Sequence, residues 1–181
     1  MPRRPGRLFR YVICGLTVAA GLAVLWWIPG EPAYRHRKAS FPVIAAFDSE
    51  LDLFFFKPQT PPLTIRDGRL RVALPPGEWP GFELRPLPPD WRGYSTLVLA
   101  FTNPGDTPLP LTLRVDDLHH NQEVTDRYNR SFVLPPAASH VLRIPLADVA
   151  AAPEGRRMDM ARISGLIVFG RPEAAGRVLL V

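Results

Sequence analysis

The clearest alternation of apolar and polar residues lies in residues 63–74, whose sequence is LTIRDGRLRVAL. A large apolar residue occupies every second position on both sides of the dipeptide Asp67-Gly68. Such alternation favours a half-buried β-strand. The dipeptide favours a two-residue hairpin loop, because glycine readily adopts the positive φ that tight hairpin turns need. The pattern therefore predicts two antiparallel strands joined at this turn.

Strand signals continue through the rest of residues 41–181. Residues 95–103, STLVLAFTN, are apolar with little interruption, which favours a strand inside a sheet. Residues 111–117, LTLRVDD, alternate again and put three apolar side chains on one face and three polar ones on the other: Leu111, Leu113 and Val115 against Thr112, Arg114 and Asp116. Further strands are expected at residues 131–134, 139–146, 163–169 and 177–181, and short helical turns near 147–152 and 158–162.

Short strands separated by proline-rich and glycine-rich turns predict an all-β fold. The 22 prolines argue against a helical bundle, because a helix interior tolerates proline poorly. Residues 41–181 are long enough for an antiparallel two-sheet jelly-roll sandwich of about eight to ten strands. We expect the last strand, residues 177–181, to lie beside the first. In a strand, Phe54-Phe55-Phe56 would turn at least one ring away from the core.

The N-terminal segment has a different pattern. Residues 11–28 are apolar and uncharged, and as a helix they would span about 27 Å, close to the thickness of a bilayer core. Trp26 and Trp27 lie at the far end of this run, where indole rings favour the membrane interface. No small-residue cleavage pattern follows the run, which favours an uncleaved anchor over a removed signal peptide. The expected organisation is a basic cytoplasmic flank (1–10), a transmembrane anchor (11–28), a polar tether (29–40) and the sandwich domain (41–181).

The charge distribution supports this division. The formal net charge is +5, yet seven of the 22 basic residues lie in residues 1–38 with a single acid, so residues 39–181 sum to −1. A near-neutral domain gives no reason to expect nucleic-acid binding. The four arginines before the apolar run favour a cytoplasmic N-terminus, with the domain on the periplasmic or extracellular side of the inner membrane. The single cysteine, Cys14, lies in the apolar run, so the domain has no disulfide and no thiol.

Several short motifs in residues 41–181 occur in a familiar order. They are Phe47-Asp48 before the hairpin, W-x-G-Y-x-x-L from Trp91 to Leu97, Asn103-Pro104, Asp116-Asp117, D-R-Y-N from Asp126 to Asn129, and R-I-P-L from Arg143 to Leu146. In this order the chain resembles galactose-binding-like and CIA30-like carbohydrate-binding modules, and it is similar to exported domains of some VanZ-like bacterial membrane proteins. The resemblance implies a non-catalytic domain that recognises an envelope glycan or polysaccharide. Such modules usually end in a strand carrying an aspartate, and RVLLV lacks it, so a terminal cation ligand of the family type is absent.

Polar residues concentrate in residues 114–130. Sugar recognition needs donors and acceptors aimed at hydroxyls and an aromatic ring under the pyranose face. The predicted ligand-binding residues are Arg114, Asp116, His119, Asn121, Asp126 and Arg127, with Trp79 or Trp91 as the aromatic platform. Two alternatives stay open: Asp117, Asp126 and Arg127 could cap a long turn and pair with each other, and Trp91 and Tyr94 could belong to the core.

Metal and catalytic signals are weaker. Oxygen ligands at Asp48 and Glu50 are candidates for a structural calcium ion. A zinc site could draw on Asp116, Asp117, His119, His120 and Asp126, although adjacent histidines in an extended chain point apart. No nucleophile elbow, catalytic cysteine or phosphate-binding loop is present in the sequence, so we expect no enzyme and no cofactor. The alternative function is a protein–protein scaffold in a cell-envelope complex that uses the same fold without sugar.

Overall fold

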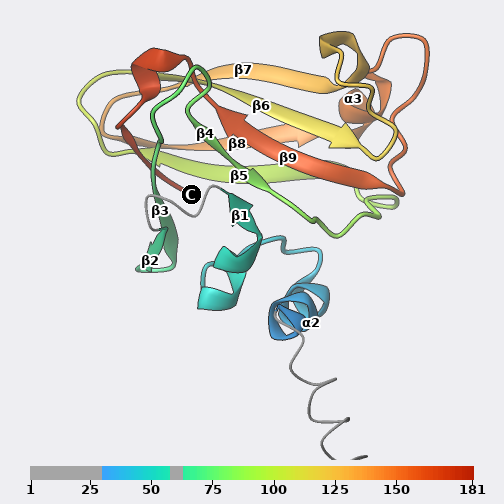
Figure 1. The fold of residues 1–181 in the computed structure, drawn as a ribbon, viewed down its shortest axis with the longest axis horizontal. Coiled ribbons are helices and arrows are strands. Elements are labelled where there is room, and N and C mark those ends of the chain that lie inside the picture. The colour runs from blue at the N-terminus through green and yellow to red at the C-terminus, as the bar shows by residue number, and fades with distance from the viewer. Residues whose placement is uncertain (1–29, 58–62) are drawn as a thin grey trace, which may run out of the picture.

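The computed structural model describes residues 30–57 and 63–181, which form two five-stranded antiparallel sheets packed face to face (Figure 1). The first sheet has the order β1 (Phe56–Lys57), β4 (Gly81–Leu84), β9 (Ile163–Phe169), β6 (Leu109–Asp117) and β7 (Tyr128–Leu134). The second sheet has the order β2 (Thr64–Arg66), β3 (Arg69–Ala73), β10 (Val178–Leu180), β5 (Thr96–Asn103) and β8 (Ala138–Pro145). The predicted mostly-β, two-sheet antiparallel architecture is confirmed.

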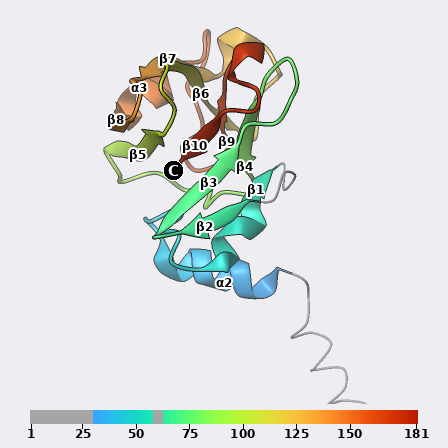
Figure 2. The same cartoon turned by 90° about the vertical axis from the view of Figure 1, so that its left-hand side faces the viewer.

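Short helices complete the fold. They are α2 (Glu31–Ser40), α3 (Leu146–Ala151) and the 3₁₀ helices η1 (Glu50–Phe55), η2 (Val124–Asp126) and η3 (Pro172–Ala174). Figure 2 shows α2 below the hairpin of β2 and β3, at the base of the sandwich. The predicted helical turn near residues 147–152 is α3, whereas residues 158–162 form a turn rather than a helix.

The predicted hairpin is present as β2 and β3. Ile65 pairs with Leu70, and Asp67 and Gly68 both have positive φ, of 53° and 66°. Positive φ at both loop residues matches the right-handed twist of the flanking strands.

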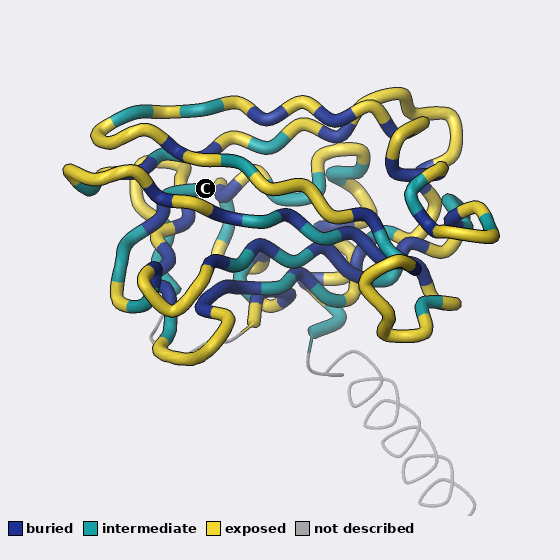
Figure 3. Tube along the Cα trace, turned by 90° about the horizontal axis from the view of Figure 1, so that it is seen from above, coloured by how far each residue is buried: buried dark blue, intermediate teal, exposed yellow. Residues whose placement is uncertain are grey.

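The core lies between the two sheets and follows the predicted alternation. Along β6, Leu111, Leu113 and Val115 are buried on the inner face. Figure 3 shows this alternation as buried and exposed residues that succeed one another along the strands. Trp91 is 3% exposed, and its indole N–H donates to the carbonyl of Pro88, so it belongs to the core and has no free face for stacking.

Two local expectations differ from the structure. The phenylalanine run is divided between two elements instead of forming one strand: Phe54 and Phe55 end the 3₁₀ helix η1 and Phe56 begins β1, with Phe54 exposed and the other two buried. The last strand, β10, pairs with β3 and β5 in the second sheet, whereas β1 belongs to the first. Both differences arise because packing between distant segments decides them.

The expected tether forms helix α2. Its Arg37 is 4% exposed, stacks over the ring of Phe55 at 3.5 Å and donates from Nη1 to the carbonyl of Pro86. These contacts join α2 to the domain, and local sequence could not reveal them. The predicted span 11–28 and its flank 1–10 lie outside the described residues. Among residues 30–57 and 63–181, no helix is both long enough and apolar enough to cross a membrane.

Candidate functional site

A broad hollow of about 950 Å³ lies on the outward face of the first sheet. It is lined by Lys57, Trp79, Gly81, Phe82, Glu83, Arg114, Val124, Arg127, Ile167 and Phe169. These residues come from β1, β4, β6 and β9, from the loop before β4 and from the segment before β7. We call this surface the sheet hollow.

Strand register explains how distant residues meet here. Directly paired residues cross all five strands in one row: Lys57, Glu83, Ile167, Arg114 and Asn129. Paired residues of adjacent antiparallel strands point to the same face. With about 4.8 Å between strands, the row is about 19 Å long, a length that suits an extended ligand lying across the sheet.

Trp79 provides the aromatic surface of the sheet hollow. It lies in the loop before β4 and is 61% exposed. Its ring meets the ring of Phe169 at 90°, with 5.6 Å between centroids. The contact with Phe169 supports the ring while most of its surface remains open to a ligand.

Arg114 is held in place by a buried carboxylate. Its Nε donates to Asp116 Oδ2 at 2.9 Å, and Asp116 is 1% exposed. Asp116 also accepts from Arg85 Nη2 at 3.1 Å and from the hydroxyl of Ser164 at 2.8 Å. Asp116 therefore acts as an anchor beneath the surface and positions two guanidinium groups.

The Arg85–Asp116 pair lies against the backbone of β9 at Gly165. A Cβ atom at this position would be 2.5 Å from Arg85 Nη2 and 2.7 Å from Asp116 Oδ1. The absence of a side chain at Gly165 leaves the space that this ion pair occupies.

Arg127 lines the sheet hollow and has one buried donor that is not used within the fold. Its Nε is buried and has no hydrogen-bond partner within the described residues. Burial lowers the pKa of Arg127, and the nearby Arg114 lowers it further, against the opposing effect of Asp116. The group stays protonated, since an arginine is charged at all ordinary pH values. An unpaired buried donor costs about 1–3 kcal/mol.

A second polar cluster lies at the end of β6. Its charged groups form hydrogen bonds with one another and with nearby backbone. Arg156 donates to both oxygens of Asp117, at 2.7 and 2.9 Å, and from Nε to Asp126. Backbone N–H groups of Asp159 and Asn121 donate to the same two carboxylates. We call this set the Arg156 cluster.

The electrostatics of the Arg156 cluster follow from these bonds. Burial alone would raise the pKa of Asp117, but its hydrogen bonds from Arg156 and Asp159 leave that pKa below the ordinary value. Hydrogen bonds from Arg156 and then from Asn121 lower the pKa of Asp126. Both carboxylates are therefore ionised and fully occupied in holding residues 118–126 against the loop before β9.

The structure places the predicted site residues in four different regions: the sheet hollow, the Arg156 cluster, the loop after β6 and the core. Trp79, Arg114 and Arg127 line the sheet hollow, and Asp116 lies beneath it. The others do not line it: Asp126 belongs to the Arg156 cluster, His119 and Asn121 are exposed in the loop after β6, and Trp91 is in the core. The alternative prediction was that Asp117, Asp126 and Arg127 pair with one another in a long turn. The structure is close to it, except that Arg156, rather than Arg127, pairs with the two aspartates.

Sequence reasoning missed Lys57, Glu83, Phe169 and Arg156. The first three join Arg114 in the lining of the sheet hollow only through strand register, and β4 was not predicted as a strand. Arg156 lies 39 positions after Asp117. The one available signal was the alternation of residues 163–169, which puts Ile167 and Phe169 on one face.

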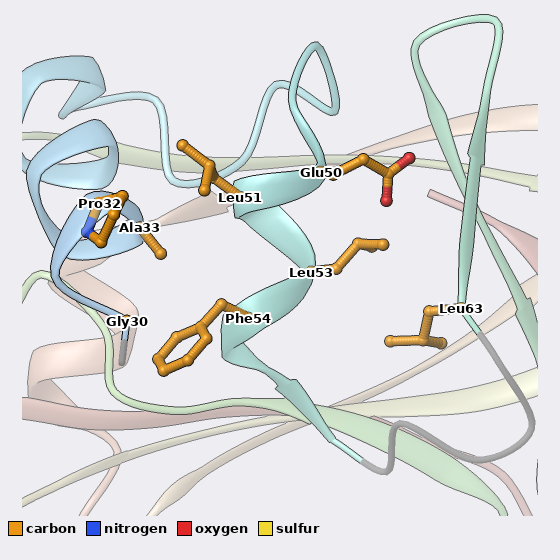
Figure 4. A pocket seen from close by; sticks show the side chains of 8 residues that line it. All are labelled: Gly30, Pro32, Ala33, Glu50, Leu51, Leu53, Phe54 and Leu63. Atoms are coloured by element: carbon orange, nitrogen blue, oxygen red, sulfur yellow. The ribbon is translucent and has the colours of Figure 1, made fainter. Parts of the chain in front are cut away.

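A second hollow, of about 420 Å³, lies at the base of the domain between α2, η1 and the start of the hairpin (Figure 4). Its lining is apolar apart from Glu50, whose carboxylate extends toward the hairpin side. Without further polar groups this hollow offers little to saccharide hydroxyls.

The structure groups the predicted metal ligands differently from the sequence prediction. Asp48 converges with Asp52 and His36, and Glu50 is not part of this group. In the part of the chain that the structure describes, the histidines and aspartates of residues 116–126 do not form a comparable group of three.

Comparison with solved structures places the fold among known sandwiches. Part of PfGH50B matches with a TM-score of 0.51 and 13% identity, covering 65% of this chain and 20% of that protein, so the chain spans about a fifth of its length. The family 11 carbohydrate-binding module from Clostridium thermocellum, solved in complex with a β-1,3-1,4-mixed-linked tetrasaccharide, matches with a TM-score of 0.44 and 10% identity, covering 65% of this chain and 75% of the module. The solution structure of CtCBM11 has a TM-score of 0.46 and 13% identity, covering 66% and 76%.

No family model and no curated protein sequence matches the chain. The similarity to part of PfGH50B is one of fold alone.

Proposed function

We propose that the sheet hollow binds a glycan without cleaving it. The observation that carries the proposal is the exposed ring of Trp79 on the same face as Arg127, whose buried Nε has no partner within the described residues. A tryptophan ring can stack on the C–H face of a pyranose, and guanidinium N–H groups can donate to its oxygens.

The charge of the sheet hollow favours an acidic glycan. Lys57, Arg114 and Arg127 contribute three cations against the single carboxylate of Glu83. A guanidinium group forms its strongest hydrogen bonds with anionic oxygens such as carboxylates. A polysaccharide carrying carboxylate or sulfate groups therefore suits this surface better than a neutral one.

The lining of the sheet hollow supports binding over catalysis. Glycoside hydrolases typically place two carboxyl groups across the scissile bond. The lining offers one, Glu83, and its carboxylate lies 3.3 Å from Arg85 Nε.

The proposal includes anchoring of the domain at the outer face of a bacterial inner membrane by residues 11–28. The support is the uncharged apolar run itself, with arginines before it, and the start of α2 at Glu31 soon after it. The domain would then hold an envelope glycan close to the membrane, as the resemblance to exported domains of VanZ-like proteins implies.

The test is glycan-array binding followed by calorimetry on the full chain in detergent micelles. We expect Trp79→Ala and Arg127→Ala each to weaken binding about tenfold, about 1.4 kcal/mol. Phe54→Ala and Arg143→Ala are matched controls, since both residues are exposed outside the sheet hollow. Equal losses in the controls, or binding that is indifferent to Trp79 and Arg127, would contradict the proposal.

The alternative is a protein-binding scaffold, favoured by Val98 and Val141, which are 48% and 51% exposed on the second sheet. Under this alternative no glycan binds the folded chain, and cross-linking to an envelope partner depends on these two valines.

A further inference from the structure

We propose that His36, Asp48 and Asp52 form a binding site for a zinc-type divalent cation at the junction of α2 and η1. His36 Nε2 lies 3.5 Å from Asp52 Oδ1 and 3.8 Å from Asp48 Oδ1. All three donor atoms lie within 4.8 Å of one another. The site is independent of glycan binding, because none of its residues lines the sheet hollow.

The spacing of the three donor atoms suits one shared ion. Zinc binds imidazole nitrogen and carboxylate oxygen at about 2.0–2.2 Å, so two ligands of a tetrahedral site lie about 3.4 Å apart. The two distances from His36 are only slightly longer than this. Small side-chain rotations would therefore bring the three atoms into the first coordination sphere.

Asp52 is fixed for this role before any ion arrives. Its side chain is 3% exposed, and its Oδ2 accepts the backbone N–H of Phe47 at 2.9 Å. That hydrogen bond orients the carboxylate and leaves Oδ1 facing His36. Hydrogen bonds that orient ligands in this way are characteristic of metal sites.

A buried carboxylate needs a compensating charge. Arg37 is the nearby cation on α2 and interacts electrostatically with Asp52, but its Nη1 donates to Pro86 and its guanidinium stacks on Phe55. Arg37 Nε and Nη2 make no hydrogen bond within the described residues. A cation between the two aspartates and His36 would complete the local charge balance.

The donor set indicates the class of ion. Calcium takes six to eight oxygen ligands, whereas zinc is commonly held by three protein ligands of mixed nitrogen and oxygen with water in the fourth position. The side chain of Asp48 is 70% exposed and that of His36 is 25% exposed, so the ion has a route in and room for water.

The bound ion would attach α2 to the sandwich. His36 lies on α2, whereas Asp48 and Asp52 lie just before and within η1, which leads into β1. Figure 1 shows α2 beside the cyan turn of η1 at the base of the molecule. The ion therefore connects the helix nearest the apolar N-terminal run to the domain.

The experiment is calorimetric titration of the untagged, chelator-treated full chain in detergent micelles with Zn²⁺ and, separately, with Ca²⁺. We expect one zinc ion per chain and at least tenfold weaker calcium binding. His36→Ala and Asp52→Asn should each weaken zinc binding at least tenfold, and asparagine keeps an oxygen that can accept from Phe47. A Co²⁺ titration provides a spectroscopic signature that depends on His36.

Two variants serve as controls. Glu50→Gln changes an acid close to the site in sequence but outside the group of ligands. His119→Ala removes a histidine that faces a single carboxylate, Asp159, at 3.6 Å. Both should bind zinc within twofold of the unaltered chain. The proposal is overturned if zinc does not bind the folded chain, if His36→Ala binds as tightly as the unaltered chain, or if calcium binds as tightly as zinc.

Discussion

The sheet hollow and the Arg156 cluster are both built from charged residues near β6, yet their hydrogen bonding differs. In the Arg156 cluster all four carboxylate oxygens of Asp117 and Asp126 accept a hydrogen bond from within the protein. In the sheet hollow, Arg127 has a buried donor without a partner within the described residues, and Trp79 is largely exposed. The polar groups of the Arg156 cluster satisfy one another and hold the fold, whereas the sheet hollow combines an incompletely bonded arginine with an exposed aromatic ring.

The strongest test of this comparison is Arg156→Ala. It would leave the buried carboxylate of Asp117 without its charged partner, and we expect the free energy of unfolding to fall by about 3 kcal/mol. Urea unfolding followed by tryptophan fluorescence measures the change. Arg156→Lys is the matched control, since it keeps the charge and loses only the bidentate geometry, so its loss should be smaller. An unchanged stability in Arg156→Ala would show that the cluster does not hold the fold.

Acid should weaken the Arg156 cluster selectively. The pKa values of Asp117 and Asp126 are lowered in the folded state, so their contribution to stability is complete above the ordinary aspartate pKa of about 3.9. That contribution is lost as the pH falls through the lowered folded-state values. We expect unfolding midpoints in urea to decline below about pH 4. The decline should be shallower in Arg156→Ala, and equal slopes in both proteins would contradict the assignment.

Arg127→Ala should have the opposite effect from Arg156→Ala: it should reduce glycan affinity and leave stability nearly unchanged. Because the substitution removes a buried donor that has no partner, we expect stability to change by less than about 1 kcal/mol while glycan affinity falls. Urea unfolding and calorimetry on the same preparation separate the two effects. A large loss of stability would mean that Arg127 belongs with the structural residues.

The smallest effect is expected at His119. Its side chain is 54% exposed and lies outside the sheet hollow, so His119→Ala should change stability by less than about 0.5 kcal/mol and leave glycan affinity unaltered. A clear loss of affinity would extend the binding surface into the loop after β6 and remove the distinction between the two regions.

The sequence predicted most reliably what local pattern controls. Alternation and the Asp67-Gly68 turn defined the hairpin, and the period of two in residues 111–117 identified the buried face of β6. The same alternation predicted that Asp116 lies on a polar, solvated face. In the structure Asp116 is buried beneath Arg85 and Arg114. Burial of a charged residue depends on partners, and Arg85 lies 31 positions away.

The candidate site was predictable in part for the same reason. Trp79, Arg114 and Arg127 have the right chemistry, and the sequence identified them as ligand-binding candidates. Their neighbours Lys57 and Glu83 enter the row through the register of β1 and β4, which no local pattern specifies. Loop residues such as Asn121 looked equally suitable, because polarity alone does not show whether a group is already used within the fold.

Gly165 shows how the anchor beneath the sheet hollow limits the tolerance of the chain to substitution. Its backbone angles are not of the kind that require glycine, yet even the single methyl group of alanine would meet the Arg85–Asp116 ion pair. In a mutational scan, side chains at this strand position should therefore be disfavoured for lack of space rather than for conformation. Alanine should be better tolerated in a background where Arg85 is also shortened, so the effects of substitutions at the two positions should depend on each other.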